Sequence, residues 1–180
     1  MAKAKVSTLV REDVTSVCQL RRAIEPFLPC GLMATPRPPN LDSVLFALPP
    51  QACDEENIVV YILQRFQMWL ASFDDIAAFK IGIAIDPVER YSDGYSKEGQ
   101  WVFMDVVFRG SVQACHDMER TLIKLLRGIA GCYNIKPGGE GISALTKETC
   151  HCYIVYAAAG HGVGLKRARD LATAVSSNTP

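Results

Sequence analysis

The chain has 180 residues, of which 49% are hydrophobic and 21% are charged, so it is long enough for one domain with a sizeable core and too short for two. Its 19 Lys and Arg residues equal its 19 Asp and Glu residues, which excludes nucleic-acid binding through bulk positive charge. Any contact with nucleic acid must therefore come from a local basic patch.

Seven cysteines follow no spacing that would indicate a disulfide framework. The first residues are not followed by the long apolar run of a secretory signal, and no stretch reaches the ~18 apolar residues of a membrane span. We therefore expect an intracellular protein, in the cytoplasm or nucleus, that does not enter a membrane and keeps its cysteines reduced.

The first 54 residues are expected to form an arm ahead of the domain. Apolar residues spaced by three or four over 8–28 predict an amphipathic helix, and the prolines between 29 and 50 exclude a long helix or a central strand. The arm over 1–54 either contacts a partner, including a second copy of the chain, or packs on the domain.

Residues 55–160 have the sequence pattern of a mixed α/β domain. Strands are expected at 58–63, 79–84, 101–108 and 152–156, where β-branched and aromatic residues form short runs. Helices are expected from Asp86-Pro87, from Ser111 to about Gly128, and over 165–175. The prediction is an α/β (α+β) fold with a small three-stranded sheet flanked by helices, a C-terminal strand–helix extension, and a helix and tail over 161–180.

Several short motifs stand in a fixed order within this domain. They are Val59-Val60-Tyr61, Lys80-Ile81-Gly82, Arg90 eight positions after Gly82, Glu119 in the later helix, and Asn134 ahead of the glycine-rich segment 137–141. In order and spacing this set resembles the GIY-YIG nuclease superfamily, in its Lys-Ile-Gly branch.

The chain departs from that pattern in three places. The first motif lacks its glycine, and the two strand motifs lie further apart than in the family. Gly94 stands four positions after Arg90, where the family often has His or Tyr, and the nearby Tyr91 and Tyr95 are out of register.

The resemblance implies a metal-dependent endonuclease that hydrolyses phosphodiester bonds of DNA. By this resemblance, Tyr61 is the general base, and Lys80 supplies the positive charge that favours the ionised form of Tyr61. Arg90 binds the phosphate. Glu119 binds Mg²⁺ or Mn²⁺, and Asn134 orders the loop or a phosphate. The alternative is a GIY-YIG-like module that binds nucleic acid or protein without catalysis.

Five basic residues are the expected nucleic-acid contacts outside this catalytic set: Arg120, Lys124, Lys136, Lys166 and Arg167. Each functional assignment has a structural alternative. Tyr61 can be a core tyrosine, Arg90 a surface ion-pair partner, and Glu119 a solvated helix residue, while Asn134 can cap a turn.

Overall fold

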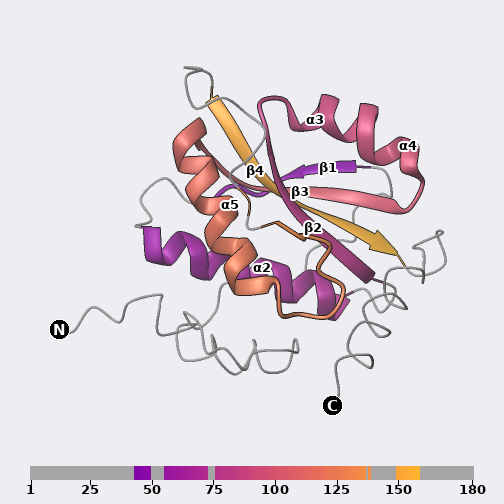
Figure 1. The fold of residues 1–180 in the computed structure, drawn as a ribbon, viewed down its shortest axis with the longest axis horizontal. Helices are drawn as coiled ribbons and strands as arrows, with labels where there is room; N and C mark the ends of the chain where they lie inside the picture. Colours follow the sequence, from indigo (N-terminus) through magenta and orange to yellow (C-terminus); the bar gives the residue numbers. More distant parts are fainter. Residues whose placement is uncertain (1–42, 50–54, 73–75, 137, 139–148, 159–180) are drawn as a thin grey trace, which may run out of the picture.

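The structure is a computed structural model, and it describes residues 43–49, 55–72, 76–136, 138 and 149–158 (Figure 1). The helices expected over 8–28 and 165–175 lie outside these residues. Within the described part of the chain, no helix combines the length and the apolar character needed to cross a membrane.

The fold is a mixed α/β arrangement built on one four-stranded sheet. Its elements are β1 (Ser43–Phe46), α2 (Glu55–Ser72), β2 (Ile76–Ala84), α3 (Pro87–Arg90), the π-helical turn η3 (Tyr91–Tyr95), α4 (Ser96–Glu98), β3 (Trp101–Ser111), α5 (Val112–Leu126) and β4 (Thr149–Ala158). The strand order is β1-β3-β4-β2. β4 runs antiparallel to both of its neighbours, and β1 runs parallel to β3.

The strand expected at 58–63 is wrong, because these residues belong to helix α2. The six-residue window is rich in β-branched side chains, which favoured a strand. Over a longer window the buried positions Val59, Leu63, Phe66 and Trp69 recur every three or four residues, as on one side of a helix. The helical period therefore overrides the local strand propensity.

The sheet has a fourth strand where three were expected, and this strand comes from the segment assigned to the arm. β1 pairs with β3 from Ser43 opposite Phe103 to Phe46 opposite Val106. It is an edge strand of four residues, so the prolines on either side of it interrupt no pairing. The domain consequently begins before residue 55.

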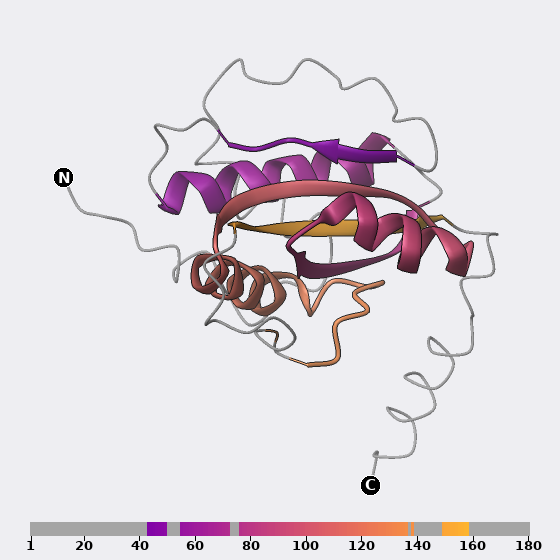
Figure 2. The same ribbon diagram turned by 90° about the horizontal axis from the view of Figure 1, so that it is seen from above.

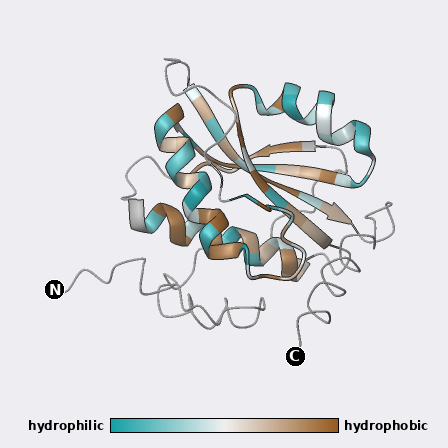
Figure 3. Ribbon diagram, viewed as in Figure 1, coloured by the Kyte–Doolittle hydropathy of each residue, from teal (hydrophilic) through white to brown (hydrophobic). Residues whose placement is uncertain are grey.

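The two faces of the sheet carry different layers. One face packs α2 and α5 against an apolar core that includes Phe79, Phe103 and Ile154. In Figure 2, α2 lies toward the β1 edge of the sheet and α5 toward the β2 edge. The other face is covered by the α3–α4 stretch through Tyr91 and Tyr95. The residues of this stretch are mostly hydrophilic (Figure 3), and the core beneath it, which includes Met104 and Val155, is smaller than the core on the α2–α5 face.

A buried ion pair fastens α2 to the middle of the sheet. Asp105 on β3 is 0% exposed, and its Oδ2 accepts hydrogen bonds of 2.7 Å from Arg65 Nε and from Trp69 Nε1. Burial raises the pKa of Asp105, while Arg65 and Trp69 lower it. A buried carboxylate is tolerated here because α2 supplies a cation and two donors.

We expect Arg65→Met to lower the free energy of unfolding by about 3 kcal/mol at pH 7, because it leaves the Asp105 carboxylate buried without its cation. Urea denaturation measures this loss. Since burial holds the folded-state pKa of Asp105 above its ordinary value, the loss should shrink as the pH falls through that pKa and the carboxyl takes up a proton. Arg109→Met, at an exposed arginine of β3, is the matched control and should change stability little. Equal losses in the two variants would contradict the role of the ion pair.

Candidate active site at the β2 edge

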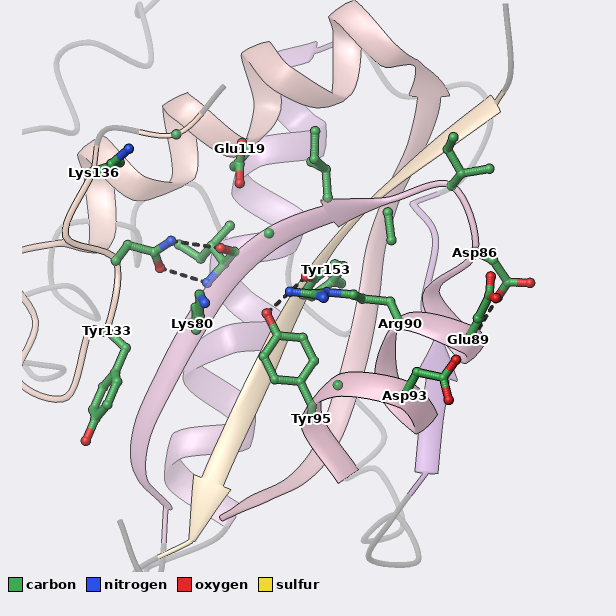
Figure 4. Close-up of a pocket in the computed structure, with 18 of the residues that line it drawn as sticks. Lys80, Asp86, Glu89, Arg90, Asp93, Tyr95, Glu119, Tyr133, Lys136 and Tyr153 are labelled. Atoms are coloured by element: carbon green, nitrogen blue, oxygen red, sulfur yellow. Dashed lines mark hydrogen bonds between the residues drawn. The ribbon is translucent and has the colours of Figure 1, made fainter. Parts of the chain in front are cut away.

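A pocket of about 1030 Å³ opens along the edge strand β2 (Figure 4). Its lining comes from β2, from the α3–η3 stretch, from residues 133–136 and 138, from α5 through Glu119 and from β4 through Tyr153. Segments far apart in the sequence thus meet at one edge of the sheet, where all of them border β2.

Four of the five side chains predicted to be catalytic line this pocket: Lys80, Arg90, Glu119 and Asn134. The fifth, Tyr61, lies on α2, where it packs partly buried against the apolar core and is absent from the lining. The interpretation of Tyr61 as a core tyrosine therefore fits its position.

The five predicted nucleic-acid contacts are divided by the structure. Lys136 lines the pocket. Arg120 and Lys124 are exposed on α5 and do not line it, and Arg120 forms a 3.3 Å ion pair with Asp117. Lys166 and Arg167 lie outside the described residues.

Tyr153 of β4 lines the pocket, although the sequence did not single it out. It stands directly opposite Gly82 in the antiparallel pairing of β2 and β4, so both residues face the same side of the sheet. A Cβ at Gly82 would lie 2.5 Å from the Tyr153 hydroxyl oxygen and 2.7 Å from Cζ. The glycine of the Lys-Ile-Gly motif thus provides the space that this ring occupies.

A second tyrosine reaches the same place through the π-helical turn. In η3 the Ser96 N–H bonds to the Tyr91 carbonyl five residues back, so residues five apart stack on one side. Tyr95, five positions after Arg90, therefore lies beneath its guanidinium, with Cζ 5.1 Å from the ring centroid. The position four after Arg90 is Gly94, as the sequence shows, but the turn brings Tyr95 into register instead.

The two hydroxyls and two cations form one compact group. The Tyr95 and Tyr153 hydroxyl oxygens lie 3.1 Å apart and share a hydrogen bond. Lys80 Nζ lies 5.7 Å from the centroid of the Tyr95 ring, so Lys80 and Arg90 both lie within cation–π range of this ring. Figure 4 shows Arg90 pointing toward both tyrosines from α3.

Burial and the neighbouring charges set the protonation of this group. The pKa of Arg90 is raised, chiefly by a hydrogen bond to the Tyr153 hydroxyl. Burial raises the pKa of Tyr153 well above its ordinary value, although the Arg90 charge opposes this shift. At neutral pH the site therefore presents a charged guanidinium beside a protonated Tyr153.

Asn134 attaches the segment 131–136 to the edge of β2. Its Oδ1 accepts a 2.8 Å hydrogen bond from the Ile81 N–H, and its Nδ2 donates a 2.8 Å bond to the Ile81 carbonyl. Backbone bonds from Phe79 to Gly131 and from Tyr133 to Phe79 continue this pairing. The side-chain amide thus continues the hydrogen bonding of the sheet at the edge of β2. The segment covers this edge, and Lys136 is held at the pocket.

Glu119 is the pocket's candidate metal ligand. Only 7% of it is exposed, and its side chain lies close to Gly138, where an added Cβ would come within 3.2 Å of Oε2. Within the described residues, no group of three or more His, Cys, Asp or Glu side chains is placed to hold a metal ion. A single carboxylate nevertheless fits Mg²⁺, which binds through one or two carboxylates and keeps several waters.

Comparison with known proteins gave no match: neither a protein-family model, nor a curated protein, nor a solved structure matched the chain. The candidate site consequently rests on its own geometry.

Sequence reasoning missed Tyr153 and Tyr95 as residues of the site. Tyr153 was expected only as part of a final strand, because nothing in the sequence indicates that this strand pairs with the Lys-Ile-Gly strand. Tyr95 was placed out of register, because an α-helical period was assumed after Arg90. The signal for Tyr95 is that Gly94 stands where the family often has His or Tyr, and an aromatic residue follows it directly.

We expect Gly82→Ala to destabilise the protein by about 1–3 kcal/mol and to displace the Tyr153 ring, because the new methyl group overlaps it. Thermal unfolding and a crystal structure of the variant measure the two effects. Gly94→Ala is the matched control, since a Cβ there meets Arg90 Nη1 at 3.5 Å, an ordinary contact. If Gly82→Ala were as stable as Gly94→Ala, the close packing of Tyr153 would be refuted.

Asn134→Ala should remove the protection of the Ile81 amide against hydrogen exchange, because no side chain then accepts its hydrogen bond. Loss of both bonds should destabilise the fold by about 1–3 kcal/mol. Asn134→Asp keeps the acceptor and loses the donor, so it should preserve part of the protection. In the control Gln113→Ala, which removes an exposed amide bonded to Asp117, Ile81 should exchange as in the parent protein. Unchanged exchange in Asn134→Ala would mean that the segment is held by its backbone bonds alone.

Proposed function

We propose that the pocket hydrolyses phosphodiester bonds of nucleic acid, with DNA as the expected substrate, as a metal-dependent endonuclease of the GIY-YIG type. The observation that carries this proposal is that Lys80, Arg90, Glu119 and Asn134, chosen by their spacing in the sequence, line one pocket. Two buried tyrosine hydroxyls stand beside Arg90 on its floor. A phosphodiester is the substrate class that this combination of cations, hydroxyls and a carboxylate suits.

Arg90 and Lys80 are the groups that bind the phosphate. A guanidinium presents a planar fork of donors that suits two phosphate oxygens, and an ammonium adds a point charge. Contact with Tyr153 raises the pKa of Arg90, so Arg90 stays charged throughout the pH range of an assay. Both cations lie close to the Tyr95 ring, so a phosphate that they bind is held beside this tyrosine.

The two tyrosines take different parts. Because burial raises the pKa of Tyr153, this hydroxyl keeps its proton and donates a hydrogen bond. Tyr95, as the phenolate, takes the proton of the attacking water, in the role that the resemblance gave to Tyr61. Its oxygen lies 3.1 Å from the Tyr153 hydroxyl, which would donate to it and hold it in place.

Glu119 would hold the divalent ion, Mg²⁺ or Mn²⁺. When bound, such an ion offsets the negative charge on the leaving oxygen. Glu119 suits this part because it is a carboxylate at the wall of the pocket and is largely shielded from solvent. Asn134 acts indirectly, by holding the segment that carries Lys136.

The purified chain should nick plasmid DNA in the presence of Mg²⁺, and Glu119→Gln, Arg90→Met and Tyr95→Phe should each reduce the rate by at least about 100-fold. Tyr153→Phe should lower the rate less than Tyr95→Phe, because Tyr153 positions the base through the shared hydrogen bond and does not itself take the proton.

The control is Arg109→Met, which removes an exposed cation of β3 outside the pocket and should leave nicking unchanged at moderate salt. Nicking that survives Glu119→Gln would rule out the assigned metal site. Binding of DNA without cleavage in either Mg²⁺ or Mn²⁺ would identify the chain as the non-catalytic binding module instead.

A further inference from the structure

Apolar side chains stand exposed on the walls of this pocket. Ile135 is 70% exposed and Ile85 is 41% exposed, and both line the pocket together with the half-buried Tyr133. Exposure of large apolar side chains to water is unfavourable. Their position in one pocket with Lys80 and Arg90 indicates a ligand that has both apolar faces and negative charge. A nucleic-acid strand has this chemistry when its bases are turned out of their stack.

The two isoleucines lie apart along β2. Ile135 adjoins Asn134, which is bonded to Ile81, whereas Ile85 follows the end of the strand. Four residues of strand separate Ile81 from Ile85, which is roughly 13 Å at ~3.3 Å per residue. A stacked strand spans that separation in about four nucleotides at ~3.4 Å each, so the two isoleucines face different nucleotides of one strand.

The depth of the two tyrosine hydroxyls indicates how far a strand must enter the pocket. Tyr95 and Tyr153 are 3% and 2% exposed, so a phosphate that reaches their hydroxyls must pass between the α3–η3 wall and the segment 133–136. Tyr133 lies on that segment, as Figure 4 shows, and the ring of Trp101 supports it edge-to-face at 5.7 Å. A supported aromatic ring at the entrance is a stacking surface for a displaced base.

We propose that the substrate of this pocket is a nucleic-acid strand with unstacked bases beside the scissile phosphate, such as a single strand or an unpaired segment, and that Ile135 keeps those bases apart. The inference rests on the proposed function for its phosphate chemistry. It assigns to the segment 133–136 the selection between unpaired and paired strands. Apolar side chains that separate base steps are a known device of nucleic-acid-binding proteins.

The test uses the full chain and three DNAs of one sequence: a single strand, a duplex, and a duplex with an unpaired segment, each carrying 2-aminopurine. Fluorescence of the probe is measured with Ca²⁺, and cleavage with Mg²⁺. We expect binding to raise the fluorescence, and the unpaired DNAs to be cleaved about tenfold faster than the duplex. Ile135→Ser should abolish the fluorescence rise and most of that preference. The control Phe46→Ser, at a side chain 55% exposed on β1 and outside the pocket, should retain both.

Equal cleavage of all three DNAs, or an unchanged preference in Ile135→Ser, overturns the inference and leaves the hydrolytic function standing. A fluorescence rise that depends on Ile135 without cleavage of any DNA supports the unstacking surface and contradicts the hydrolytic function. Absence of both binding and cleavage overturns the two together.

Discussion

The close approach of Tyr153 to Gly82 determines where the other groups of the pocket stand. β4 lies between β2 and β3, so its side chains on this face meet a neighbouring strand on each side. Only a residue without Cβ opposite Tyr153 lets the ring lie against β2, because any larger side chain would overlap its hydroxyl end. From this position the hydroxyl meets both Tyr95 and Arg90. One glycine on an edge strand thus makes room for a buried polar cluster.

The sheet separates two polar systems that serve different purposes. On the α2 face, Asp105 is enclosed by Arg65 and Trp69, and the charges are matched within the core. On the α3 face, the Arg90 guanidinium meets the hydroxyls of neutral tyrosines, whose oxygens leave its charge uncompensated. The first arrangement holds α2 to the sheet, because loss of either partner would leave a buried charge unpaired. The second favours binding of an anion, since a cation held by neutral groups keeps its field.

The placement of a few cations explains how a chain of zero net charge can offer a phosphate site. Three basic side chains line the pocket, from β2, α3 and the segment 131–136, beside four acidic ones, so the lining as a whole carries no excess of positive charge. Three of the acidic residues, Asp86, Glu89 and Asp93, come from the α3–η3 stretch, where Asp86 caps a helix and Asp93 pairs with Lys97, and the fourth is Glu119. Overall charge therefore describes solubility here, whereas the distribution of charge decides what the pocket can hold.

The sequence by itself determined the mixed α/β class, the strands around residues 80, 105 and 154, and the cap at Ser111, because these follow from local periodicity and capping. The resemblance singled out five candidate site residues, of which four line the pocket. Tertiary structure decided the rest. Helix α2 forms where a strand was expected because its apolar side faces the sheet over many residues, a preference that six residues cannot express. Tyr153 lines the pocket and Tyr61 does not. Strand pairing brings Tyr153 there, and such long-range pairing is not encoded in local sequence patterns. Tyr95 meets Arg90 only because the π-helical turn shifts the register by one residue, which spacing rules for an α-helix could not foresee.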